Sequence, residues 1–250
     1  MADSQLHIRT AAALLCLAWL TPAASAQDAA PPVDLALVLA VDASGSIDPA
    51  EFQLQKEGIA AALLSDEVLS AVLSGRHDRI AIALVEWGSP GGATLVVDWM
   101  LIGDRAGAEA FAATLLAAPR SQQSYNALGD AISLATALLG ACPCQPTRRV
   151  IDISGDNPDN RSQLPAPLAR DAAVAAGITV NALAILNSDL LGPSGRPYLV
   201  ERYESDVIGG FGAFVATAHT RADFARALRQ KMILEIAGTK SPDVTAAELD

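Results

Sequence analysis

The sequence predicts an α/β fold, a doubly wound and mostly parallel sheet with helices on both faces and one antiparallel hairpin at its edge. Short runs of Val, Ile, Leu and Ala alternate with longer helical patterns along the chain, which is typical of strands joined by crossover helices. The chain is also 51% hydrophobic but only 4% aromatic, a mixture typical of a parallel sheet covered by helices. Its 250 residues suffice for one such domain with a large core.

The first strand and the helices after it have the clearest sequence signals. Residues 33–41 form a near-continuous apolar run, as expected of a central strand that is buried on both faces. A helical pattern then covers residues 49–73, with Asp48 as its N-cap and Glu51 at the third position of a capping box. The pattern is interrupted near Ser65, where we expect a break in the helix.

Two further strands are expected at residues 79–87 and 93–102, because both runs are rich in apolar and β-branched side chains. The glycine-rich segment 88–92 between them favours a tight turn, so we predict that these strands form the antiparallel hairpin. Asp104 then stands at the N-cap position of a helix expected over residues 105–118.

The second half of the chain continues the alternation of helices and strands. Helices are expected over residues 126–139, 164–176 and 220–236, and strands over residues 149–154, 178–186 and 211–216. A short element is expected within residues 198–207. The last strand is expected at the edge of the sheet.

The ends of the chain are predicted to lie outside the folded domain. An apolar stretch over residues 11–20 is followed by an Ala-rich segment that ends at Ala26, which is typical of a cleaved secretory signal. The stretch is short for a membrane span, which needs about 20 residues. We therefore expect a signal peptide at 1–26, a flexible leader at 27–32, one domain at 33–237 and a polar tail at 238–250. The mature protein is expected to be periplasmic or secreted, without a membrane span.

Charge and cysteine content restrict the possible partners. The formal net charge of −11 argues against nucleic acid and anionic membranes as partners, and it is compatible with divalent cations. Cys142 and Cys144 flank Pro143, and in an exported protein they can form a local disulfide or stay as thiols. Their spacing is weak evidence for a zinc site, because His77 and His219 are far away in sequence.

The strongest candidate site is the segment Asp42-Ala43-Ser44-Gly45-Ser46, which directly follows the first strand. Open α/β sheets bind their ligands at the carboxyl ends of their strands. One carboxylate and two hydroxyls are hard oxygen donors, which suit Mg²⁺, Mn²⁺ or Ca²⁺ rather than zinc or copper. Because Asp48 is better placed to cap the helix, Asp42, Ser44 and Ser46 are available for a cation.

Two further segments are expected to reach the same place. Asp156 ends the strand at 149–154, and a polar loop that contains Asn126 enters a helix. If these turns share one end of the sheet, their oxygens can converge on one cation. The alternatives are an ordinary Asp-Asn-Pro turn for Asp156 and a helix cap for Asn126. Asp152 either faces the same site or forms a salt bridge with Arg148 or Arg149.

These three segments together resemble the von Willebrand factor type A fold, a Rossmann-like fold, and its metal-ion-dependent adhesion site. The resemblance implies that Ser44 and Ser46 bind the metal directly. It also implies that Asp42 and Asp156 act mostly through water, and that an acidic group of a protein partner completes the octahedron.

One position departs from the family pattern. The threonine that the family uses as a third direct ligand corresponds to Asn126 in this sequence. An Asn carbonyl oxygen can bind a hard cation, so we expect Asn126 to be the ligand. Ser124 and Asp130 are possible substitutes.

The resemblance covers roughly residues 33–237. The run Val85-Glu86-Trp87, the strand that leads to Ser154-Gly155-Asp156, the segment Ile208-Gly209-Gly210 and the closing helix resemble a bacterial family of exported, type-A-like proteins of unknown function.

The function implied by this resemblance is binding rather than catalysis. We expect an exported, metal-dependent binding or adhesion module that captures an acidic group of a protein partner. The sequence contains no Gly-x-Ser-x-Gly elbow, Walker loop or His-Glu-x-x-His motif, and no obvious base lies beside the Asp42 segment. A metal-dependent hydrolase and a structural module with a degenerate metal site remain as alternatives.

Overall fold

The computed structural model describes residues 30–220 and 223–238. The expected signal peptide, and the expected tail beyond Gly238, lie outside these residues. The described helices and strands are, in chain order, β1 (Pro32–Asp42), α1 (Pro49–Leu63), α2 (Asp66–Leu73), β2 (Ile80–Trp87), β3 (Thr94–Ile102), α3 (Arg105–Ala117), α4 (Leu128–Gly140), β4 (Gln145–Gly155), α5 (Ala166–Ala175), β5 (Thr179–Ile185), α6 (Tyr198–Asp206), β6 (Val215–Ala218) and α7 (Phe224–Ala237).

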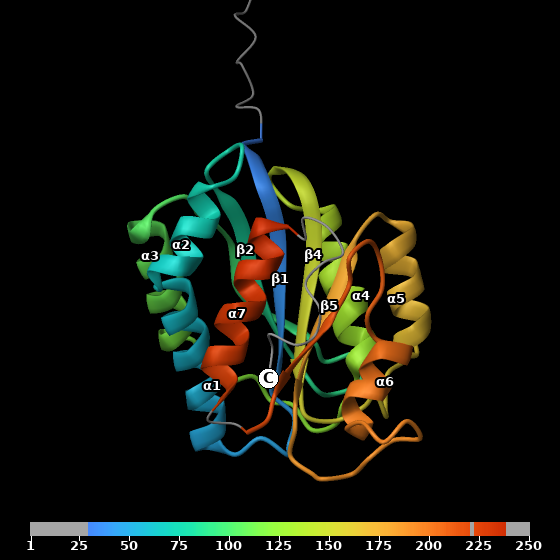
Figure 1. Cartoon of the computed structure of the whole chain (residues 1–250). Coiled ribbons are helices and arrows are strands. Elements are labelled where there is room, and N and C mark those ends of the chain that lie inside the picture. Colours follow the sequence, from blue (N-terminus) through green and yellow to red (C-terminus); the bar gives the residue numbers. More distant parts are fainter. Residues whose placement is uncertain (1–29, 221–222, 239–250) are drawn as a thin grey trace, which may run out of the picture.

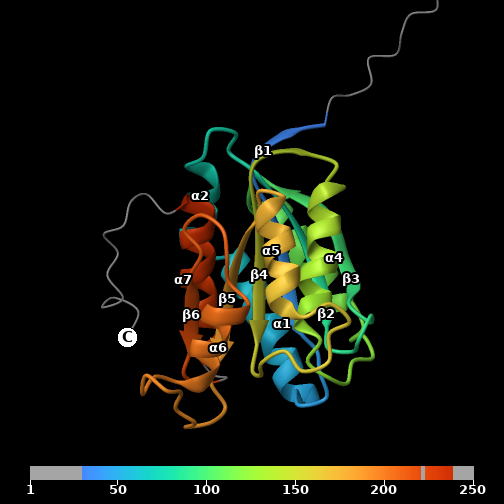
Figure 2. The same ribbon diagram turned by 90° about the vertical axis from the view of Figure 1, so that its right-hand side faces the viewer.

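The strands form one sheet in the order β3-β2-β1-β4-β5-β6. The pair β2–β3 is antiparallel, and the other four neighbouring pairs are parallel. Helices α1, α2, α3 and α7 cover one face of the sheet, and α4, α5 and α6 cover the other (Figure 1). Figure 2, turned by 90°, shows α7 and α4 on opposite sides of the strands. The predicted fold class is therefore confirmed, including the antiparallel hairpin at one edge.

The side chains of the central strand β1 alternate between two core layers. Leu35, Leu37 and Leu39 lie in the layer of α1, α2, α3 and α7, and Ala36, Val38 and Ala40 lie in the layer of α4, α5 and α6. All six are at most 2% exposed. Burial on both faces explains why this strand is an almost continuous apolar run in the sequence.

The N-caps predicted for the first helices are present in the structure. Asp48 and Glu51 form the predicted capping box at the start of α1. The predicted break is real, because Ser65 caps α2 by accepting the N–H of Val68 at 3.3 Å. Asp104 caps α3 by accepting the N–H of Gly107 at 2.7 Å.

The start of β4 differs from the prediction. This strand begins at Gln145, four residues before the predicted start, and the N–H of Gln145 donates to the carbonyl of Pro31 at 2.9 Å. The end of the expected leader therefore takes part in the sheet. In the loop before β4, Cys142 and Cys144 form a disulfide, which is one of the two states that the sequence left open.

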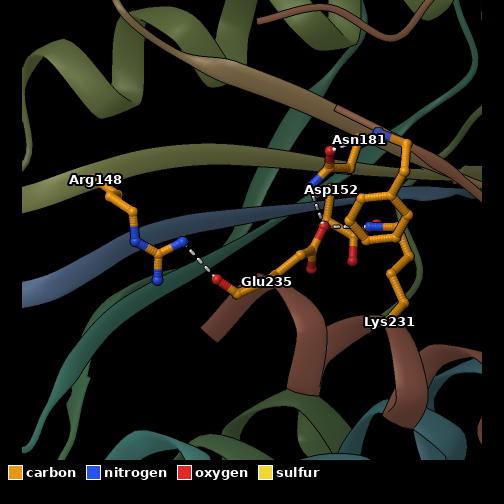
Figure 3. Close-up of polar contacts among 6 residues, drawn as sticks. Arg148, Asp152, Asn181, Lys231 and Glu235 are labelled. Carbon is orange, nitrogen blue, oxygen red and sulfur yellow. Dashed lines mark hydrogen bonds and ion pairs between the residues drawn. The ribbon is translucent and has the colours of Figure 1, made fainter. Parts of the chain in front are cut away.

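A buried ionic cluster fixes α7 to the sheet (Figure 3). The Nζ of Lys231 lies 2.6 Å from Asp152 Oδ1 on β4 and 2.5 Å from Glu235 Oε1 on its own helix. Asn181 on β5 donates its Nδ2 to Glu235 Oε1 at 2.8 Å. The side chains of Asp152, Lys231 and Glu235 are at most 1% exposed.

The salt bridge with Arg148 or Arg149, one of the two alternatives considered for Asp152, is therefore wrong. Lys231, almost eighty positions further along the chain, is its partner instead. Arg148 donates to the carbonyls of Glu235 and Ile236 at 2.7 and 2.6 Å. These carbonyls lie in the last turn of α7, where helix carbonyls lack partners within the helix.

Substituting Glu235→Gln should make the stability of the protein less dependent on pH. Burial, and then the nearby Asp152, raise the pKa of Glu235 from 4.5 to about 8, although Lys231 opposes the rise. Between these values the folded state holds a proton that the unfolded state has released, so this group makes the wild type lose stability as the pH rises. Urea unfolding at roughly pH 5, 7 and 9 checks this. The stability of the variant relative to wild type should increase with pH, and a constant difference would contradict the raised pKa.

Candidate metal centre

The loop after β1 presents the first three candidate ligands. Asp42 is the last residue of β1, and its Oδ1 accepts the N–H of Ser44 at 2.8 Å. The hydroxyl oxygens of Ser44 and Ser46 lie 3.0 Å apart. Asp42 and Ser44 are fully buried, whereas Ser46 is exposed. This oxygen cluster therefore opens to solvent on the side of Ser46.

Asp156 lies at the same end of the sheet because β1 and β4 are parallel neighbours. The Oγ of Ser46 lies 3.3 Å from Asp156 Oδ1 and 3.5 Å from Oδ2. Asn157 donates its Nδ2 to Oδ1 at 2.7 Å, and Asn187 donates its Nδ2 to Oδ2 at 3.2 Å. The carboxylate thus connects the loops that follow β1, β4 and β5, which meet in the lower part of Figure 1.

The loop that contains Asn126 packs between the loops that follow β1 and β4. The N–H of Gly45 donates to the carbonyl of Ser124 at 3.3 Å. Asn126 and Asn160 form two bonds, from Asn126 N–H to Asn160 Oδ1 at 3.2 Å and from Asn160 N–H to the Asn126 carbonyl at 3.0 Å. The structure therefore brings Asp42, Ser44, Ser46, Asn126 and Asp156 into one region, which we call the candidate metal centre.

Asn126 does not act as the cap of α4. The N-cap is Ala127, and the N–H of Leu128 donates to Asp159 Oδ1 at 3.0 Å. The side-chain oxygen of Asn126 is buried and has no hydrogen-bond partner. It is therefore available to a ligand.

A glycine after β2 permits the close approach of these loops. A Cβ on Gly88 would lie 2.9 Å from the carbonyl oxygen of Tyr125 and 3.1 Å from the Cα of Ser44. These distances are too short for a side chain, so only glycine fits between the two segments.

Arg120 holds the loop after β1, a role that sequence reasoning missed. Its Nη2 lies 2.9 Å from each of the carbonyl oxygens of Ala43, Ser44 and Ile47. The guanidinium also lies over the ring of Phe52, 4.7 Å from its centroid. No local pattern predicts such contacts, because all three carbonyls are more than seventy positions away in sequence.

The electrostatics of the candidate metal centre favour a cation. Burial, and then the neighbouring Asp156, raise the pKa of Asp42 to about 7, although hydrogen bonds from Ser44 oppose the rise. The second oxygen of Asp42, Oδ2, is buried and has no hydrogen-bond partner. Buried acceptors without donors are uncommon, and this centre contains two of them, Asp42 Oδ2 and Asn126 Oδ1. Such a set of carboxylate, hydroxyl and amide oxygens fits a hard divalent cation.

Of the two substitutes considered for Asn126, Asp130 has a structural role through its side chain. Asp130 accepts the N–H of Gly91 at 2.8 Å and that of Gln163 at 3.0 Å, so its carboxylate supports the hairpin turn and the loop before α5. Ser124 contributes its backbone carbonyl to Gly45. Within residues 30–220 and 223–238, no group of three or more His, Cys, Asp or Glu that could hold a metal is found. A metal here would therefore depend on hydroxyl and amide oxygens as well as carboxylates.

Residues 32–240 match the model of a family described as "Protein of unknown function (DUF1194)". The chain belongs to this family. The comparison with curated proteins gives no match.

Solved structures place the DUF1194 chain in the von Willebrand factor type A fold. The pilus adhesin SpaC from Lactobacillus rhamnosus GG, in its open conformation, matches with a TM-score of 0.57 and 17% identity over 83% of this chain and 30% of SpaC. A von Willebrand factor type A protein from Catenulispora acidiphila matches with a TM-score of 0.54 and 17% identity over 82% of this chain and 43% of its own.

A third structure is proximal thread matrix protein 1 (PTMP1) from the mussel byssus, with a zinc-occupied MIDAS motif. It matches with a TM-score of 0.57 and 14% identity over 82% of this chain and 46% of PTMP1. The DUF1194 chain therefore spans less than half of each of these three proteins. Together they confirm the predicted resemblance of the fold.

Substituting Arg120→Met should lower the free energy of unfolding by about 2 kcal/mol, because it removes hydrogen bonds between a charged group and backbone carbonyls. Urea unfolding measures the change. The matched control is Arg76→Met, which alters an exposed side chain near the start of β2 and should cost about 0.5 kcal/mol or less. Equal effects of the two substitutions would mean that Arg120 does not hold the loop.

Proposed function

We propose that this chain is an exported binding module that holds a divalent cation at its candidate metal centre and captures an acidic side chain of a protein partner. Mg²⁺ is the expected ion, with Mn²⁺ or Ca²⁺ as alternatives. The observation that carries the proposal is the pair of buried acceptors without donors, Asp42 Oδ2 and Asn126 Oδ1, beside the hydroxyls of Ser44 and Ser46.

Each residue of the centre has a distinct part in this proposal. The oxygens of Ser44, Ser46 and Asn126 would hold the ion, and Asp42 and Asp156 would supply the compensating negative charge. When bound, the ion supplies a positive charge that attracts an acidic group from outside. Because Ser46 is exposed, an incoming side chain can reach this side of the centre.

Binding is favoured over catalysis because the neighbouring carboxylates have structural roles. Asp159 accepts the N–H groups of Leu128 and Ala166 at 3.0 and 3.1 Å, which ties the starts of α4 and α5 together. Asp130 accepts backbone N–H groups in the same way. A carboxylate used like this is not available as a general base.

Two of the compared proteins support the proposal. SpaC is named a pilus adhesin, and the PTMP1 structure holds zinc in its MIDAS motif. The oxygen donors of the present centre favour Mg²⁺ or Mn²⁺ over zinc, which prefers nitrogen and sulfur ligands.

Export is the remaining part of the proposal. Residues 1–26 have the pattern of a cleaved signal, and the partner would be met in the periplasm or outside the cell. Among the described residues, no helix has the length and apolar character that a membrane span requires.

Calorimetry should show that the wild-type protein binds Mg²⁺ or Mn²⁺ and that Asp42→Ala abolishes this binding. Asn126→Ala should weaken metal binding at least about tenfold, because it removes one ligand oxygen. That oxygen makes no hydrogen bond in the protein, so its removal breaks none. Asp66→Ala is the matched control, since it removes an exposed carboxylate on α2, and it should leave metal binding unchanged. Equal metal uptake by wild type and Asp42→Ala would place the site elsewhere.

Capture of an acidic group is tested with acetyl-Gly-Asp-Gly-Asn-Gly-amide, the one-acid peptide. An NMR titration should show binding in excess Mg²⁺ and none in EDTA, because the carboxylate is expected to need the ion. NMR is suited to the weak affinity of a single exposed charge contact. Binding that persists in EDTA would contradict the proposed function.

A further inference from the structure

An exposed pair of side chains lies directly beside the candidate metal centre. The guanidinium of Arg161 lies over the ring of Tyr125, 5.0 Å from its centroid. Tyr125 is 46% exposed, and Arg161 is also exposed. Tyr125 precedes Asn126 and Arg161 follows Asn160, and these two asparagines are joined by the two hydrogen bonds described above. Tyr125 is therefore next in sequence to the proposed ligand Asn126, and Arg161 is next to the residue that holds Asn126 in place.

The stacked arrangement leaves the donors of Arg161 available. Within residues 30–220 and 223–238, Arg161 forms no ion pair or hydrogen bond, and its contact with the ring of Tyr125 leaves its N–H donors without a partner. A guanidinium held in this way presents its N–H groups at its edge, in the geometry that a carboxylate accepts with two parallel bonds.

Because the chain is negatively charged, a positive side chain near the site favours the binding of an acidic partner. The net charge of −11 repels an acidic partner at long range, and the repulsion must be offset close to the site. The neighbouring polar residues Ser46, Asn157 and Asn160 are neutral, and Asp159 is negative. Arg161 is thus a positive group at a position where an acidic segment would pass.

We propose that Arg161, positioned by Tyr125, is a second anchor of the binding site and selects protein segments that carry two acidic residues. The first acidic residue binds at the metal centre and the second binds Arg161, so this inference rests on the proposed function. In an extended segment, residues two positions apart point to the same side, roughly 7 Å from each other. A partner with acids two positions apart is therefore the form in which this selection is tested.

The test compares the one-acid peptide with acetyl-Gly-Asp-Gly-Asp-Gly-amide, the two-acid peptide, in excess Mg²⁺. The wild-type protein should bind the two-acid peptide about fivefold more tightly in NMR titrations, as expected for one additional exposed charge pair. Arg161→Ala should remove this preference while its affinity for Mg²⁺ and for the one-acid peptide stays unchanged. Arg76→Ala, which removes the same charge near the start of β2, should keep the preference.

The role of Tyr125 is tested by rescue. Tyr125→Ala should reduce the preference for the two-acid peptide, and Tyr125→Phe should restore it, because phenylalanine keeps the ring on which the guanidinium stacks. A purely structural role of this side chain would change the affinity for both peptides equally.

The outcomes separate this inference from the proposed function. If Arg161→Ala keeps the preference for the two-acid peptide, or weakens the binding of both peptides equally, Arg161 is not a second anchor. EDTA-sensitive binding of the one-acid peptide would still support the proposed function in that case. If the one-acid peptide binds equally well in EDTA, both proposals are wrong. Tighter binding of an alginate oligomer than of the two-acid peptide would assign the site to acidic polysaccharides and overturn the selection of protein segments.

Discussion

The parallel pairing of β1 with β4 holds the candidate metal centre together. The register sets Val41 opposite Ser154, so that both strands end at the same level of the sheet. Two carboxylates from distant parts of the chain, Asp42 and Asp156, therefore meet in a buried setting. Their mutual repulsion opposes folding, and it is tolerated because hydrogen bonds from Ser44, Ser46 and two asparagines hold them.

Much of the fold could be predicted because its signals are local. The apolar run of β1, the capping box of Asp48 and Glu51, and the glycine-rich hairpin turn each act within a few residues, and each appears in the structure as expected. The meeting of Asp42, Ser46 and Asp156 also followed from a general rule, since parallel strands end at a common edge.

The contacts that could not be predicted join residues that are far apart in sequence, where several residues of the same charge could be the partner. Asp152 had two arginines nearby in sequence, yet it pairs with Lys231, because α7 packs across that face of the sheet. Arg120 follows the end of α3 without any distinctive pattern, and only the tertiary fold brings it to the loop after β1. The predicted start of β4 lies four residues too late in the sequence, because Gln145 and its neighbours are polar. Their backbone nevertheless pairs with the start of β1.

The hairpin also determines which strand forms this edge of the sheet. It leaves β3 as an outer strand of nine residues, whose free backbone groups would be a template for aggregation if the strand were flat. Its pairing with β2 is irregular between Ile82 and Val85, and the charged side chain of Asp98 is exposed on it. Irregular pairing and charge on an outer strand both discourage the addition of a foreign strand.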